Sequence, residues 1–446
     1  MYRERTNFSS GTLATGRRLI YGVLERLGAD SAWLMAGEAF NRGGRFLLLL
    51  LIARAVGAES FGGWVIAIAT ATILANAGDA GLALIVTRDI AADRTVTRRY
   101  LANLMTVAPV LALVMFGLLA ALSPLSPPGT SPLLLLVIGI SGVLESTAYL
   151  LLAPLRAHGR SRPEGLLRAF LGTALLIAGG TALFVSQGRT DAIAPMFPLI
   201  ASVALVLAVF AMVRSFGMIR PQFDGTLVRR LFGSALPVFA STIVFFVYFR
   251  VDTFLLAYLS GEEATGLYGA AYNFAFGLAF LPLMLGRAIL PRLAACKTVV
   301  ALRAAYLRSA VITGLLAGGL SVLLVVAAPL FLSLYGAGFA GAQAPYLILI
   351  VAQGLFFFTH LNYMLIFARG RMRTGWALTL VALAVNLTAN FLLIPPMGPS
   401  GAALAMVLSE AALLAAQVPT IRSLLGSSSD ATTAMAGDRE SAARAA

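Results

Sequence analysis

The residues most able to do chemistry are charged side chains inside long apolar segments. Glu38, Arg42 and Arg45 are spaced by four and then three positions, so they share one face of a helix. Glu38 precedes Arg42 in the favourable order for an ion pair, which leaves Arg45 as the uncompensated cation. Guanidinium groups bind phosphate or carboxylate oxygens through paired hydrogen bonds. This stripe of three charged residues on one helix face therefore predicts either an anion-binding site or a set of ion pairs that locks neighbouring helices.

Four further polar residues in apolar segments are candidates for a site. Arg250 and Asp252 are two positions apart, so they face different directions and are not an obvious pair. One of the two is expected to line a cleft, and the alternative is that it only reaches back to the outer membrane surface. Glu145 and Glu410 are expected either to pair with arginines or to carry a coupling proton.

Other polar positions have simpler structural explanations. Asp79, in the segment Gly78–Gly81, is expected to stabilise a helix break, and Asn386 and Asn390 are expected to find partners across a helix interface. His360 is interpreted as a packing residue, with a proton relay as the alternative. Arg88 and Arg292 are expected at the inner ends of two spans, in structural or gating roles.

The composition explains why these charges need partners. Hydrophobic residues make up 59% of the 446-residue chain and charged residues only 12%, where a soluble protein has about 25%. A charge at the centre of a bilayer costs about 2.5–3.5 kcal/mol. The charged residues must therefore face the protein interior or water.

Twelve apolar stretches are long enough to cross a membrane, since a span needs about 20 residues. With the N-terminus inside, 27 of the 33 basic residues fall on inner segments, a bias that predicts both termini in the cytoplasm. The expected spans are 32–54, 62–86, 100–122, 131–154, 165–187, 192–213, 231–258, 265–287, 305–330, 344–368, 374–395 and 400–421.

An internal repeat divides the chain into two halves. At an offset of 204 residues, Leu51, Ala53, Gly57, Glu59 and Gly62 recur as Leu255, Ala257, Gly261, Glu263 and Gly266. Two six-span halves of equal orientation would be parallel repeats around a central cavity, an architecture typical of transporters. The predicted organisation is a cytoplasmic segment 1–31, an N-lobe 32–215, a C-lobe 216–426 and a disordered tail 427–446.

The order and spacing of short motifs resemble a known family. Over roughly residues 32–421 the chain is similar to the bacterial polysaccharide and O-antigen flippases of the multidrug/oligosaccharidyl-lipid/polysaccharide exporter superfamily. The residues that carry the resemblance are Arg54–Gly57, Phe61–Gly62, Asp79–Leu82 with Arg88, Leu236–Pro237, Val251–Asp252, Gly266–Ala271, Leu290–Leu293, Leu334–Gly336, Ala368–Arg371, Asn386 with Ile394–Gly398, Gly401–Ala403 and Ser409–Glu410.

The resemblance implies a function in the bacterial inner membrane. Members move a lipid-linked oligosaccharide across the membrane by alternating access, so Arg42, Arg45 and Arg250, with Glu38 and Asp252, are the expected substrate contacts. Expected partners are this substrate, membrane lipids and the polysaccharide polymerase or export machinery, and no nucleic acid.

No enzymatic activity, metal or cofactor is expected. One cysteine and two histidines exclude a His/Cys metal cluster, and no nucleotide-binding loop is present, so energy would come from an ion gradient or the membrane potential. The alternatives are an ion-coupled multidrug or small-solute antiporter, which would need an acid-lined apolar pocket for cations, and a membrane polysaccharide polymerase or ligase. The positive stripe argues against the first and the short outer loops against the second.

Overall fold

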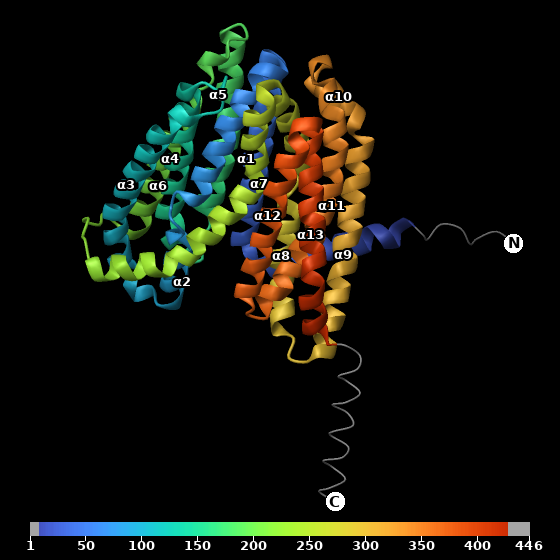
Figure 1. Ribbon diagram of the computed structural model, residues 1–446. Helices are drawn as coiled ribbons and strands as arrows, with labels where there is room; N and C mark the ends of the chain where they lie inside the picture. Colours follow the sequence, from blue (N-terminus) through green and yellow to red (C-terminus); the bar gives the residue numbers. More distant parts are fainter. Residues whose placement is uncertain (1–8, 427–446) are drawn as a thin grey trace, which may run out of the picture. The chain divides into compact units, whose positions relative to one another are not determined.

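The described part of the chain is helical, with no strand. The computed structural model describes residues 9–426, and side chains from residue 32 onward except that of Leu332. The predicted tail 427–446 and the side chains of segment 1–31 lie outside this description. Figure 1 shows the helices, which are α1 (Ser9–Ala77), α2 (Leu82–Ala92), α3 (Thr97–Leu122), α4 (Pro132–Ala157), α5 (Arg162–Val185), α6 (Met196–Phe216), α7 (Gly225–Phe276), α8 (Phe280–Ala295), α9 (Val299–Val326), α10 (Ala328–Tyr335), α11 (Gln343–Ala368), α12 (Met372–Met397) and α13 (Pro399–Leu425).

The helices account for the twelve predicted membrane crossings. Ten helical stretches of the described residues are long and apolar enough to span, and two of them, Ala32–Ala92 and Gly225–Ala295, contain 61 and 71 residues. About 20 residues cross a bilayer core, so each of these two stretches must cross twice. The chain is therefore an all-α polytopic membrane protein, and the predicted number of about twelve spans is confirmed.

Two glycines turn the chain inside the long helices. Gly57 in α1 has φ 74° and Gly261 in α7 has φ 85°, a left-handed conformation that residues with a Cβ rarely adopt. They occupy equivalent positions of the internal repeat, 204 residues apart. Each glycine therefore provides the corner between two successive spans, in the first and in the second repeat.

A helix break follows α1, at the position where the sequence predicts one. Residues 78–81 form a turn in which Ala80 and Gly81 both have positive φ. The Asp79 carboxylate accepts hydrogen bonds from the backbone N–H groups of Gly81 at 3.1 Å and Ala83 at 2.9 Å. Asp79 thereby caps the start of α2, where backbone donors would otherwise have no partner.

The chain forms two compact units. The first contains the chain up to Leu48 with Leu74–Leu119 and Val137–Phe239, and the second contains Leu49–Ile73, Ala120–Leu136 and the chain from Ala240. This grouping by contact differs from the predicted lobes 32–215 and 216–426, which follow the order of the sequence, and the lobe boundaries stay a prediction.

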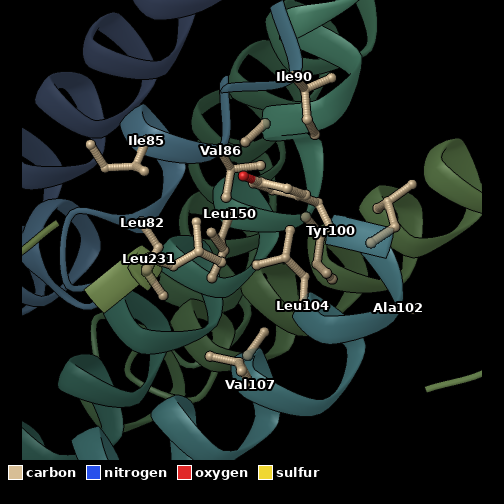
Figure 2. Close-up of a cluster of buried hydrophobic side chains, with 14 of the residues drawn as sticks. Leu82, Ile85, Val86, Ile90, Tyr100, Ala102, Leu104, Val107, Leu150 and Leu231 are labelled. Atoms are coloured by element: carbon tan, nitrogen blue, oxygen red, sulfur yellow. The ribbon is translucent and has the colours of Figure 1, made fainter. Parts of the chain in front are cut away.

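The first unit has an apolar core that joins helices distant in sequence. Figure 2 shows Leu82, Val86, Leu150 and Leu231 in one cluster with Tyr100, which is 2% exposed. Leu82 and Val86 belong to α2, Leu150 to α4 and Leu231 to α7, while Tyr100 belongs to α3. The Tyr100 hydroxyl donates to Asp89, so the one polar group of this aromatic side chain is satisfied inside the core.

The second unit contains a direct contact between the two repeats. A Cβ added to Gly62 would clash with the backbone of Glu262, and one added to Gly266 would clash with the backbone of Ala58. Ala58 and Glu262 are themselves 204 residues apart, as are Gly62 and Gly266. The contact is therefore reciprocal, as expected where a two-fold axis relates equivalent surfaces, and it supports the parallel repeat.

Candidate functional site

Small residues bring α1 and α5 of the first unit into backbone contact. Gly37 packs against Gly165 and Gly44 against Gly172, and in both helices the two glycines are seven residues apart. A Cβ at any of these four positions would overlap the backbone of the opposite helix. This close approach is typical of membrane helices, which use small residues to pack. It places the charged face of α1 opposite that of α5.

The two helices share a chain of ion pairs. Glu38 accepts from Arg42 Nε at 2.6 Å and from Arg168 Nη1 at 2.8 Å. The other side of the Arg168 guanidinium contacts Glu164 at 2.9 Å, and Glu164 also binds Arg156 Nε at 2.9 Å. Glu164 is only 3% exposed, so its charge depends on these arginines for compensation.

Arg45 has a partner of its own on α4. Its guanidinium forms a short ion pair with Glu145, and its Nε donates to Asn41 Oδ1 at 3.0 Å. The prediction that Arg45 is an uncompensated cation is therefore wrong. Sequence spacing could not show this, because Glu145 lies 100 residues further along the chain.

We call these seven charged residues the arginine cluster: Glu38, Arg42, Arg45, Glu145, Arg156, Glu164 and Arg168. Four arginines and three glutamates leave a formal charge of +1. The side chain of Arg42 is 42% exposed, against 23%, 28% and 24% for Arg45, Arg156 and Arg168. Arg42 is thus the most exposed arginine of the cluster, and it shares the Glu38 carboxylate with Arg168.

Sequence reasoning did not assign Arg156, Glu164 and Arg168 to the site. The signal that could have found them is local, since Glu164 precedes Arg168 by four residues on one helix face. The pairing of Arg168 with Glu38 of α1 depends on how the two helices pack.

Arg250 and Asp252 belong to the second unit and do not pair with each other. The Arg250 guanidinium lies over the ring of Tyr272, 4.7 Å from its centre. Asp252 is fully buried and accepts hydrogen bonds from the Tyr268 hydroxyl and the Thr253 N–H. The corner at Gly261 brings these partners together by folding the end of α7 back along its first part.

The second unit also contains a half-open cavity of about 280 Å³, lined by residues of α7, α11, α12 and α13. Glu410 is fully buried beside it and accepts hydrogen bonds from Tyr248 at 2.9 Å and Thr359 at 2.6 Å. Among the described residues no basic side chain is ion-paired to Glu410. The expected pairing of Glu410 with an arginine is therefore not observed. His360 and Gln417 line the same cavity.

Aromatic side chains surround this cavity. In a chain with 27 phenylalanines, composition favours contact with lipid for most of these rings, but the structure places several of them at the cavity wall. They are Phe245, Phe246, Tyr248, Phe249, Phe356, Tyr363 and Trp376.

The remaining predicted residues have structural surroundings. Asn386 donates to Ser409 Oγ at 3.2 Å across the α12–α13 interface, and Asn390 donates to the Asn386 side chain at 2.9 Å. Arg88 pairs with the adjacent Asp89 at 2.8 Å. Arg292 is exposed in the last turn of α8. Among the described residues no group of His, Cys, Asp and Glu could hold a metal ion.

Comparisons with known proteins agree with this architecture. Residues 27–297, more than half of the chain, match the family described as polysaccharide biosynthesis protein. No curated protein matches the chain significantly.

Three solved structures of a flippase and of transporters share this fold. The lipid II flippase MurJ in an inward closed conformation aligns with a TM-score of 0.72 and 15% identity, covering 88% of each chain. An inward-facing multidrug resistance MATE family transporter of the MOP superfamily aligns with a TM-score of 0.69 and 14% identity, covering 87% of this chain and 94% of that one. A MOP superfamily transporter from Pyrococcus furiosus, described as having a binding pocket of reverse polarity, aligns with a TM-score of 0.61 and 14% identity, covering 89% and 96%.

Proposed function

Because the chain belongs to the polysaccharide biosynthesis protein family, we propose that it is a flippase for a lipid-linked oligosaccharide. The substrate is a glycan joined through pyrophosphate to a polyprenyl lipid. It is carried from the inner to the outer leaflet of the bacterial cytoplasmic membrane by alternating access, for the synthesis of cell-surface polysaccharide such as O-antigen. The protein performs no chemical step on the glycan, which other proteins of the polymerase and export machinery would take up.

The observation that carries this proposal is the arginine cluster inside apolar helices. Its formal charge of +1 and its half-exposed Arg42 suit the negative pyrophosphate, which guanidinium groups bind through paired hydrogen bonds. Keeping buried charges in a membrane protein is costly, and such residues commonly mark a transport pathway. In this proposal Arg42 makes the first contact with the pyrophosphate, while Arg45 is ion-paired with Glu145.

The other predicted site residues keep the roles expected from the sequence. Arg250 and Asp252 remain predicted substrate contacts within the second unit, and Glu38 sets the position of Arg42 through their ion pair. Energy comes from an ion gradient or the membrane potential, with Glu410 and His360 as candidate coupling residues, whereas Glu145 takes the ion-pair role with Arg45.

Leaflet-selective labelling of the glycan tests the proposed function. In cells that lack the protein, lipid-linked oligosaccharide is expected to accumulate in the inner leaflet, and wild-type protein is expected to clear it. Arg42→Gln should reduce clearance by about tenfold or more, because the loss of one charge-assisted contact costs about 1.5–3 kcal/mol. Mass spectrometry of the extracted lipid identifies the accumulated species.

The matched control is Arg189→Gln, since Arg189 is an exposed arginine on a loop, with 78% of its side chain accessible. This variant should clear the glycolipid as wild type does. If deletion leaves every glycolipid in its normal leaflet, the flippase proposal is wrong. A glycan that reaches the outer leaflet but remains unpolymerised would instead support the polymerase or ligase alternative.

The proposed topology places both termini in the cytoplasm and Cys296 at the inner surface. Cys296 is the one cysteine of the chain and lies between α8 and α9. A membrane-impermeant maleimide is expected to label it in inside-out vesicles and not in intact spheroplasts. In a Cys296→Ser background, Ser260→Cys next to the Gly261 corner should show the opposite pattern, and labelling of both sites from one side would contradict the topology.

A further inference from the structure

We propose that the aromatic cavity of the second unit binds an organic ammonium ion that carries an apolar body. This site is separate from the arginine cluster, which is assigned to the pyrophosphate of the flippase substrate. The ligand of the aromatic cavity is positively charged, whereas pyrophosphate is negatively charged. The inference does not depend on the flippase proposal, because it rests on the walls of one cavity within one compact unit.

The walls offer aromatic surface for a cation. Phe249 lies at the centre of a cluster, with ring centres 4.8 Å from Phe245, 5.1 Å from Phe356 and 5.0 Å from Tyr248. Aromatic faces carry partial negative charge and attract quaternary or substituted ammonium groups, an interaction that strengthens when water is removed. Trp376, whose indole is the most effective ring for this contact, also lines the cavity.

Glu410 supplies the negative charge that an ammonium ion requires. Both of its carboxylate oxygens accept hydrogen bonds from neutral hydroxyl groups, those of Tyr248 and Thr359, and no ion pair balances its charge among the described residues. A buried carboxylate must be neutralised either by a proton or by a cation. An ammonium ion in the adjacent cavity would supply that positive charge in place of a proton.

The surroundings of Glu410 fit this assignment. His360 is the titratable base that lines the cavity, and in its neutral form it adds no positive charge. The charged neighbour of His360 is Arg287 of α8, which is not among the residues of the cavity wall. The remaining polar walls, among them Gln417 and Thr379, are neutral.

The size and character of the cavity select the class of cation. A volume of about 280 Å³ is at the lower end of the range for small-molecule sites, which is about 300–1,000 Å³. An alkali-metal ion would need a shell of oxygen ligands, whereas most of this wall is carbon. A small ammonium ion with an aromatic or branched alkyl group fills such a space better.

Trp376 provides a direct measurement of binding. The chain has three tryptophans, so the double variant Trp33→Phe/Trp64→Phe leaves Trp376 as the only indole fluorophore. The full-length protein in detergent is titrated with benzyltrimethylammonium and, separately, with 3-phenylpropan-1-ol as a neutral aromatic ligand. Saturable quenching is expected with the cation, with at least about tenfold lower affinity for the neutral compound.

Two variants test the role of the walls. Glu410→Gln retains one acceptor oxygen and an amide that can donate to Tyr248 or Thr359, so the hydrogen bonds can be kept while the charge is lost. It should weaken cation binding by at least about tenfold and leave the neutral ligand unaffected. Phe249→Leu, which keeps the charge and removes the central ring, should also weaken the cation selectively and serves if Glu410→Gln does not fold.

The control is Asp191→Asn, which removes a carboxylate that is 83% exposed on an outer loop and should change the affinity by less than about twofold. Equal affinity for the cation and the neutral compound, or unchanged cation binding in a folded Glu410→Gln or Phe249→Leu protein, would overturn the proposal. Arg42→Gln distinguishes this site from the flippase site, since it should reduce glycolipid clearance and leave cation binding intact.

Discussion

Arg45→Ala is expected to destabilise the protein by about 3–5 kcal/mol, the range for removing one partner of a buried ion pair. The replacement leaves the Glu145 carboxylate, whose side chain is 6% exposed, without its counter-charge. It also removes the donor that Asn41 Oδ1 accepts from. The measurement is the free energy of unfolding of the purified protein in mild detergent, or the corresponding fall in Tm.

A double-mutant cycle separates the ion pair from other effects of the substitution. Arg45→Ala/Glu145→Ala should recover much of the lost stability, because no isolated charge remains. Arg42→Ala should cost less than about 1 kcal/mol, since the Arg42–Glu38 pair is half-exposed and Glu38 retains Arg168. If the double variant loses the sum of the two single losses, Arg45 and Glu145 are not energetically coupled and the buried pair is not a stabilising unit.

The same cycle assigns the two stripe arginines different tasks. A double variant that folds but does not clear glycolipid would show that the Arg45–Glu145 pair is needed for transport as well as for stability. Normal clearance by that variant would exclude Arg45 as a necessary substrate contact and leave Arg42 as the contact within the arginine cluster. Stability and transport thus report on two separate properties of the cluster.

Gly172→Val is expected to prevent correct packing of α1 against α5. The new side chain would overlap the backbone of Asn41 and Phe40, where neither helix can move aside without breaking the neighbouring contact at Gly165. Overpacking typically costs about 1–3 kcal/mol and more where backbone is the obstacle. The expected result is a large loss of monodisperse protein in detergent and a marked fall in Tm of the fraction that remains.

Gly43→Val is the matched control for this prediction. Gly43 is adjacent to Gly44 on α1, is exposed and has open space where a Cβ would lie. The same chemical change should therefore have little effect there. Equal yields and Tm values for Gly43→Val and Gly172→Val would contradict the proposed backbone contact between the helices.

Much of the fold could be predicted because its constraints are local. A bilayer requires about 20 apolar residues for every crossing, so the number of spans follows from the lengths of apolar segments. The corners at Gly57 and Gly261 could be inferred from the repeat, and both have the positive φ that favours glycine. The break at Asp79 was likewise predictable, since a short acceptor side chain between glycines commonly caps a helix.

The aromatic cavity was less accessible to sequence reasoning. A phenylalanine in a span contributes the same hydropathy whether its ring faces lipid or protein, so composition does not distinguish the two orientations. Phe249 contacts Phe356 from a helix more than 100 residues away, and Glu410 finds its hydroxyl partners on two other helices. These contacts arise when α7, α11 and α13 pack together.

The membrane location, the twelve spans, the parallel repeat and the local Glu38–Arg42 pair follow from the amino-acid sequence, because each depends on residues within a few turns or on a simple periodic match. Only the packed helices reveal that Arg45 is neutralised by Glu145 and that Arg168 shares Glu38 with Arg42. They also reveal that Glu410 meets hydroxyl groups rather than an arginine. The physical reason is that a buried charge requires a partner, whereas which partner it meets depends on helix packing, here set by glycine contacts between α1 and α5.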